Sequence, residues 1–200
     1  MKKNVIIIIS IIMISCKGQT DLELLKFDEK LSEKTTVIQE SNKAVDGIYG
    51  FMSFETSKLN DYRFGDVSFT EYQVPNAYSY AKSNIYFYVE NYESKKYLGF
   101  SLYLAKNDEG DKLIDYLKRK YGAPESRNAM NEDESAFFWD LKSDNAWVFL
   151  TKRIEKTKDN AKFNFTNLVI VKQGTRVENS KDENVFTILE RFNLAYPKEE

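Results

Sequence analysis

The chain has 200 residues and carries 29 Lys and Arg against 31 Asp and Glu, a formal net charge of −2 at pH 7. It contains no histidine and one cysteine, which excludes Ser-His-Asp and Cys-His catalysis, zinc or haem sites built on histidine, and an internal disulfide. Lysine supplies 23 of the 29 basic residues and no basic stripe occurs, so nucleic acid is not expected as a partner. The sequence has neither a Gly-rich phosphate loop nor a Gly-x-Ser-x-Gly elbow, and no cofactor or metal is expected.

The first sixteen residues have the layout of a secretory signal peptide. A basic start is followed by an apolar run of ten residues, 5–14, and then by Ser15 and Cys16. This run is too short for a transmembrane helix, which needs about 20 apolar residues. We therefore predict that residues 1–15 are a signal peptide that is removed from the mature protein.

The end of the apolar run resembles the lipobox of bacterial lipoproteins, because Met13, Ile14, Ser15 and Cys16 stand at its four places. In that family the cysteine sulfur is diacylglycerated, the peptide is cut just before it, and the new amino terminus is usually acylated. The resemblance implies that Cys16 is the palmitate-type lipid anchor of a cell-envelope protein. By the sorting rule of some family members, Lys17 after the cysteine favours the outer membrane, with the domain in the periplasm or at the envelope surface.

The mature chain is long enough for one domain. Without residues 1–15 it has 185 residues with 27 basic and 31 acidic side chains, a formal charge of −4. We expect residues 16–26 to be a lipidated tether and residues 27–200 to form a single domain. Apolar residues at loosely helical spacing in the polar stretch 28–43 predict a helix there.

Alternation of period two predicts a β-hairpin between residues 85 and 104. Its aliphatic and phenylalanine side chains should lie on one face and its tyrosines on the other. The first set is Ile85, Phe87, Val89, Leu98, Phe100, Leu102 and Leu104, and the second set is Tyr86, Tyr88, Tyr97 and Tyr103. Upstream of this hairpin, β composition predicts strands within 48–54 and 64–72, followed by a polar loop at 73–83.

The strongest helix signal spans residues 108–121, with Leu117 at the centre of its apolar face, acids in the first turn and bases in the last. A second hairpin is expected around residues 143–145, a strand at 163–172, and a C-terminal helix between 183 and 194. Hairpins with interspersed helices predict an α+β fold, in which helices pack on one face of an antiparallel β-sheet.

The tyrosine face of the first hairpin is the candidate binding surface. Eight of the 13 tyrosines lie between residues 72 and 103, and four of them, Tyr86, Tyr88, Tyr97 and Tyr103, share this face. A tyrosine ring offers apolar area, a hydroxyl and few rotatable bonds, so an exposed set would suit a protein or glycan ligand. Tyrosine is also favoured in strands, and a covering helix or loop would make the same residues structural.

These observations favour a membrane-anchored envelope lipoprotein with a non-catalytic binding domain for a protein or a glycan, and no catalytic residue is assigned. The alternative is a carboxylate-dependent hydrolase, for which Asp140 and an acid from residues 131–134 are the least implausible pair. Asp140 falls on the face opposite Trp139 and is expected to face water. An inhibitor or immunity lipoprotein is a third hypothesis, compatible with the size and charge.

Overall fold

The computed structural model describes residues 18–31, 38–129 and 133–198. The predicted signal peptide and the lipid anchor Cys16 lie outside the described residues. No helix among the described residues is long and apolar enough to span a membrane.

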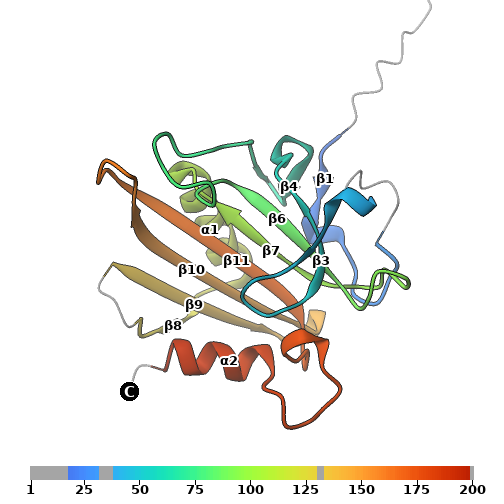
Figure 1. Cartoon of the computed structure of the whole chain (residues 1–200). Coiled ribbons are helices and arrows are strands. Elements are labelled where there is room, and N and C mark those ends of the chain that lie inside the picture. Colours follow the sequence, from blue (N-terminus) through green and yellow to red (C-terminus); the bar gives the residue numbers. More distant parts are fainter. Residues whose placement is uncertain (1–17, 32–37, 130–132, 199–200) are drawn as a thin grey trace, which may run out of the picture.

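The fold is α+β, as predicted, and its main element is an antiparallel sheet of eight strands (Figure 1). The strand order is β2-β3-β6-β7-β11-β10-β9-β8, and every neighbouring pair is antiparallel. The strands are β2 (Lys43–Val45), β3 (Met52–Thr56), β6 (Asn84–Val89), β7 (Tyr97–Leu104), β8 (Glu125–Arg127), β9 (Glu134–Leu141), β10 (Ala146–Lys156) and β11 (Lys162–Lys172).

In the part of the chain that the structure describes, a smaller sheet and two α-helices complete the layers. The small sheet is formed by β1 (Thr20–Asp21), β4 (Tyr62–Phe64) and β5 (Val67–Ser68). The helices are α1 (Asn107–Tyr121) and α2 (Ile188–Ala195). The helix predicted at 108–121 is thereby confirmed, and it ends where Gly122 adopts a left-handed φ of 81°.

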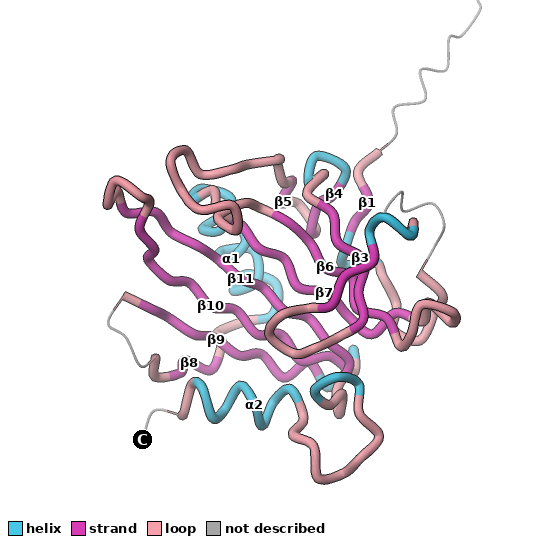
Figure 2. The backbone as a smooth tube through the Cα atoms, viewed as in Figure 1, coloured by secondary structure: helices cyan, strands magenta, loops and turns pink. Residues whose placement is uncertain are grey.

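The two helices lie on opposite faces of the sheet, which corrects the expectation that both pack on one face (Figure 2). Leu117 of α1 belongs to the same buried cluster as Leu150 of β10, whereas Phe192 of α2 lies 4.7 Å from Phe149, measured between ring centroids. Since successive side chains of a strand point to opposite faces, the helices are separated by the sheet. We call the α1 side the back face and the α2 side the front face.

A β-bulge changes the predicted face of two residues in the β6-β7 hairpin. Tyr88 pairs with Gly99, whereas Val89 pairs with Tyr97, so Leu98 is the extra residue. Tyr97 therefore lies in the back core and Leu98 in the front cluster. An unbroken alternation predicts the reverse for both residues, and that prediction is wrong.

Gly99 explains why the bulge is placed there. Its φ of 149° is rarely adopted by other residues, and a Cβ at this position would lie 2.2 Å from the carbonyl oxygen of Ile170 on β11. A side chain would push the two strands apart, so the close approach of β7 and β11 requires glycine.

The ordered domain begins earlier than residue 27, which corrects the expected tether at 16–26. Thr20 and Asp21 pair in parallel with β4, and Leu22 is only 2% exposed. Gln19 is also fixed, because its Nε2 donates to the Asn60 carbonyl oxygen at 2.9 Å. The apolar side chains of this segment are enough to dock it on the small sheet.

Two helix predictions change as well. In the described part of 28–43, Lys30 forms a β-bridge with Lys96, residues 40–42 form one 3₁₀ turn and residues 32–37 lie outside the description. The C-terminal helix starts at Ile188 rather than near residue 183, because Thr187 caps it: Glu190 N–H donates to Thr187 Oγ1 at 3.1 Å, and Thr187 N–H donates to Glu190 Oε2 at 2.7 Å. This capping box defines the helix start.

Arg127 fastens α2 to the sheet. Its side chain is buried, and its Nη1 donates to Asn193 Oδ1 at 2.9 Å. The guanidinium also lies over the rings of Phe138 at 5.4 Å and Phe192 at 5.9 Å, a cation–π arrangement that is strong when water is excluded. The short helix α2 is therefore held at one end of the front face.

Candidate functional site

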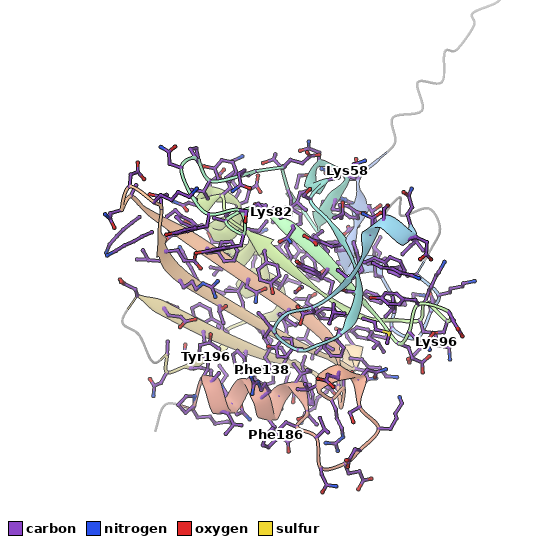
Figure 3. All side chains as sticks on the ribbon, in the orientation of Figure 1. Lys58, Lys82, Lys96, Phe138, Phe186 and Tyr196 are labelled. Atoms are coloured by element: carbon purple, nitrogen blue, oxygen red, sulfur yellow. The ribbon has the colours of Figure 1, made fainter. Side chains whose placement is uncertain are left out.

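The front face carries a groove between α2 and the opposite end of the sheet. Two adjoining cavities of about 380 and 540 Å³ share Ile48 and Arg153 in their walls, and each lies within the usual size range of ligand sites. Figure 3 labels one residue at each end of this front groove, Lys82 in the loop 73–83 and Tyr196 at the C-terminal end of α2. Other lining residues are Asp46, Glu55, Tyr80, Tyr86, Tyr103, Thr151, Phe165, Asn167, Arg191 and Leu194.

A row of aromatic rings crosses the floor of the front groove. The ring centroids of Tyr86 and Tyr103 are 5.9 Å apart in an edge-to-face arrangement, and those of Tyr103 and Phe165 are 5.8 Å apart. Arg153 continues the row, with its guanidinium 5.1 Å from the Phe165 ring centroid. The row forms because β6, β7, β11 and β10 are neighbours and each of these residues points to the front.

Polar groups stand between these rings. Arg153 Nε donates to Glu155 Oε1 at 2.6 Å, and no described residue accepts from its two terminal amino groups. Asn167 lies between Tyr103 and Thr151 in the strand register. Its Oδ1 is buried and receives no hydrogen bond from the described residues, an arrangement that costs free energy until a donor arrives.

Asp46 closes the upper wall of the groove and is almost completely buried. Its carboxylate accepts from the N–H of Tyr49 at 2.6 Å, the N–H of Ile48 at 3.2 Å and the hydroxyl of Tyr88 at 3.3 Å. Burial raises the pKa of Asp46, although these three bonds oppose the rise. The carboxylate is thus used to hold the turn 46–50 onto the sheet.

The phenols of the groove are donors and not bases at neutral pH. Burial is the main reason that the pKa values of Tyr86 and Tyr103 are raised, with the charges of Glu55 and Asp46, respectively, adding to the effect. A phenol whose pKa rises above its usual value of about 10 stays protonated. The floor therefore offers hydroxyl donors and aromatic faces.

No protein-family model, no curated protein and no solved structure matches the chain. Among the described residues, no cluster of His, Cys, Asp or Glu could hold a metal ion.

The structure divides the four tyrosines of the predicted binding surface. Tyr86 and Tyr103 are half-buried and line the front groove. Tyr88 is 0% exposed beneath Phe51, and the bulge turns Tyr97 to the back face, where its ring stacks on Phe27 at 5.8 Å. The prediction that the four tyrosines share one face is therefore wrong for Tyr97, and Tyr88 follows the alternative in which a covering segment makes it structural. Tyr86 and Tyr103 take part in the groove.

Among the described residues, the carboxylates of the hydrolase hypothesis are not brought together. Asp140 and Glu134 lie six positions apart on the single strand β9, a separation of about 20 Å, against the roughly 5–9.5 Å of a hydrolytic carboxylate pair. Asp140 is exposed and accepts from Gln173 at 2.6 Å, and Glu134 accepts from the Tyr196 hydroxyl at 2.7 Å. Asp133 is exposed next to Glu134, and residues 131 and 132 lie outside the description.

Sequence reasoning missed most of the groove. Phe165 carries a usable signal, since it alternates with the polar residues Asn164 and Thr166 in its strand, whereas Arg153 and Asn167 each lie beside another polar residue and carry none. Tyr80 lies in the stretch 73–83, whose composition predicts only a polar loop, and its ring stacks on that of Tyr78, with centroids 5.6 Å apart and planes 4° apart. What the sequence lacks is the pairing of β7 with β11, a non-consecutive pairing that places these residues beside Tyr103.

A separate cavity of about 580 Å³ lies on the back face, under residues 22–28. One of the charged residues that line it, Glu23, accepts from the hydroxyls of Tyr116 and Tyr121, each at 2.8 Å, and pairs with Lys120 Nζ at 2.6 Å. Burial alone would raise the pKa of Glu23, but the hydrogen bonds from Lys120, Tyr116 and Tyr121 outweigh burial and hold it below its usual value. These bonds are satisfied inside the protein and fasten the N-terminal segment to α1, which is a structural role.

Proposed function

We propose that the chain is a lipid-anchored protein of the bacterial cell envelope whose domain binds an envelope glycan or protein in the front groove without catalysis. The proposal that the domain binds a ligand is supported by the front groove itself. Aromatic faces, phenol donors, the terminal amino groups of Arg153 and the unpaired amide oxygen of Asn167 all lie in this groove. The anchor part rests on the N-terminal sequence.

The proposed anchor would hold the domain close to the membrane. Lys17 and Gly18 are the two residues between Cys16, the proposed lipid attachment residue, and Gln19, and the three residue steps from 16 to 19 span at most about 11 Å. Gln19 is fixed at both ends of its amide, since Ser68 Oγ also donates to its Oε1 at 2.7 Å. A ligand of the proposed site would therefore belong to the same membrane surface or to the layer next to it.

The chemistry of the groove supports binding over turnover. Its acids, Asp46 and Glu55, are occupied within the protein: Asp46 by the turn described above, and Glu55 by Lys82 at 3.3 Å and Asn84 at 2.8 Å. The raised pKa values of Tyr86 and Tyr103 remove the phenols as bases. What remains is a surface that can contact and orient a ligand.

The anchor is tested by metabolic labelling. Cells that express the full-length protein are given labelled palmitate, and the wild type should incorporate the label and partition into detergent. Cys16→Ser should do neither, because the sulfur is the attachment atom. Equal labelling of the two proteins would contradict the anchor.

Binding is tested by affinity capture. The full-length protein, immobilised in detergent, is exposed to solubilised envelope of its own cell, and retained glycans and proteins are identified. Arg153→Ala should lose the retained partner. Arg119→Ala is the matched control, because Arg119 is an exposed arginine of α1 on the back face that pairs with Asp66 at 2.7 Å. Equal retention by wild type and both variants would remove the front groove as the site.

A further inference from the structure

We infer that the front groove binds a neutral saccharide chain through side chains at the centre of the sheet. This inference rests on the proposed function and narrows its ligand from a glycan or protein to one chemical class. It is carried by four features of the groove: its ring faces, its balance of donors and acceptors, its charge, and its position over the centre of the sheet.

The ring faces suit sugar rings. A pyranose presents an apolar face of C–H groups together with an equatorial edge of hydroxyls, so it packs on an aromatic ring while its edge forms hydrogen bonds. The floor supplies Tyr86, Tyr103 and Phe165 across three adjacent strands. At the rim, Tyr80 is 58% exposed and is stacked on Tyr78, which is 50% exposed, so the pair forms a preorganised platform next to the floor.

The hydrogen-bonding groups include both donors and acceptors. Asn167 Oδ1 is buried and has no donor among the described residues. The terminal amino groups of Arg153 have no acceptor there. A sugar hydroxyl both donates and accepts, so one ligand with neighbouring hydroxyls satisfies the amide oxygen and the guanidinium at once. A purely anionic group would serve Arg153 and leave the Asn167 oxygen unpaired.

The charges of the groove favour a neutral ligand. Three cations, Lys82, Arg153 and Arg191, line it together with the acids Asp46 and Glu55. Lys82 pairs with Glu55, and Arg153 pairs with Glu155 just outside the lining. With these pairs formed, no large field of one sign remains to attract a polyanion.

The position of the groove argues against an extended peptide that joins the sheet. The floor belongs to β6, β7, β11 and β10, each of which is paired with a strand on both sides. Their backbone N–H and C=O groups are therefore used, and strand addition needs a free edge. Recognition over this floor depends on side chains alone, which suits a saccharide.

The test is a binding titration with defined oligosaccharides. Full-length protein in a zwitterionic detergent that contains no sugar is titrated by calorimetry with hexasaccharides of glucose, mannose, xylose and N-acetylglucosamine, and with a hexasaccharide of galacturonate as the anionic probe. At least one neutral hexasaccharide should bind saturably, and the galacturonate probe should bind more weakly. Asn167→Ala and Arg153→Ala should each weaken binding at least about fivefold, as expected for the loss of a hydrogen bond. Arg119→Ala should bind like wild type.

Tyr80→Ala keeps the test decisive if a floor variant fails to fold, because an exposed rim substitution should leave the fold intact and still weaken binding. Saturable binding that Tyr80→Ala and Arg153→Ala leave unchanged would place the saccharide elsewhere and overturn the inference. If no neutral hexasaccharide binds, or only the galacturonate probe does, the saccharide inference also falls. If no saccharide binds but affinity capture retains a protein partner that Arg153→Ala no longer retains, the proposed binding function is supported and only the saccharide inference is wrong. If both the titration and the affinity capture fail, the proposed binding function and the saccharide inference are both wrong.

Discussion

The two faces of the main sheet are formed by the same strands, but they differ in how completely other segments cover them. On the back, α1, the small sheet and residues 22–31 cover the strands with a continuous buried cluster that includes Phe64, Phe100 and Leu117. On the front, the buried side chains separate into a cluster under α2 and a smaller one under the loop 73–83, with the groove between them. The back face is covered by one continuous core, whereas the core on the front face is interrupted by the front groove.

Simple dimensions explain the difference. Eight strands at about 4.8 Å spacing make a sheet about 34 Å wide, and a helix with its side chains is only about 10–12 Å wide. Neither helix can cover a face alone. The small sheet and the N-terminal segment complete the back layer. On the front, the loop 73–83 covers only the end opposite α2, and the turn 46–50 lies between the two. An opening of this kind results when too few segments share one face.

The largest effect is expected beneath the groove, where a tyrosine is part of the core. Tyr88 is 0% exposed and its hydroxyl contacts Asp46, so Tyr88→Ala should lower the free energy of unfolding by about 3–5 kcal/mol. Denaturant unfolding measures this loss. Tyr80→Ala, at the exposed rim, is the control and should change stability by about 0.5 kcal/mol or less. Similar small losses for the two variants would mean that the front face has no core under its groove.

On the back face, truncation of Leu117 should cost nearly as much. Leu117 is 0% exposed in the cluster under α1, so Leu117→Ala should destabilise the domain by about 2–5 kcal/mol through lost burial and the cavity that remains. Asp115→Ala, on the exposed side of the same helix, should be nearly neutral. A Leu117→Ala loss below about 0.5 kcal/mol would show that α1 is peripheral.

Glu23 fastens the N-terminal segment to α1 on the back face, and its contribution to the free energy of unfolding should depend on pH. The pKa of Glu23 is lower in the folded protein than in the unfolded chain, so the charged form contributes stability above the unfolded value of about 4.3, and this contribution is lost as pH falls through the folded pKa. Glu23→Gln should therefore cost about 1.5–3 kcal/mol at pH 7, the size of hydrogen bonds to a charged group. Unfolding measured from pH 7 down to pH 3 should show the wild type and the variant converge. A difference that stays constant over this range would contradict the role of the ionised carboxylate.

The smallest effect is expected at the end of the front face, in the cap of α2. Thr187→Ala removes the capping box with Glu190 and should cost about 0.5–2 kcal/mol. Hydrogen exchange should show faster exchange in α2 while the amides of α1 keep their protection, because α2 covers only one end of one face. Glu183→Ala, in the exposed turn before the helix, is the control. Equal loss of protection in α1 would show that the two faces unfold as one unit.

The sequence alone determined the local elements with strong periodicity. The alternation of Ile85, Phe87 and Val89 defined a strand, and the spacing of Leu113 and Leu117 between acids and bases defined α1. The same signals predicted the α+β class, because hairpins and helices that alternate in the chain rarely assemble otherwise. These features depend on residues that are close together in the sequence, so they can be predicted from the sequence alone.

Only the tertiary structure decided which side chains share the site. The bulge at Leu98 reversed the faces of Tyr97 and Leu98, and it depends on the approach of Gly99 to β11, a strand more than sixty residues away. The non-consecutive pairing of β7 with β11 then placed Arg153 and Asn167 near Tyr103. Period-two patterns fix the two faces of each strand but carry no information on which strands are neighbours or where the register shifts. The front groove follows from those long-range choices.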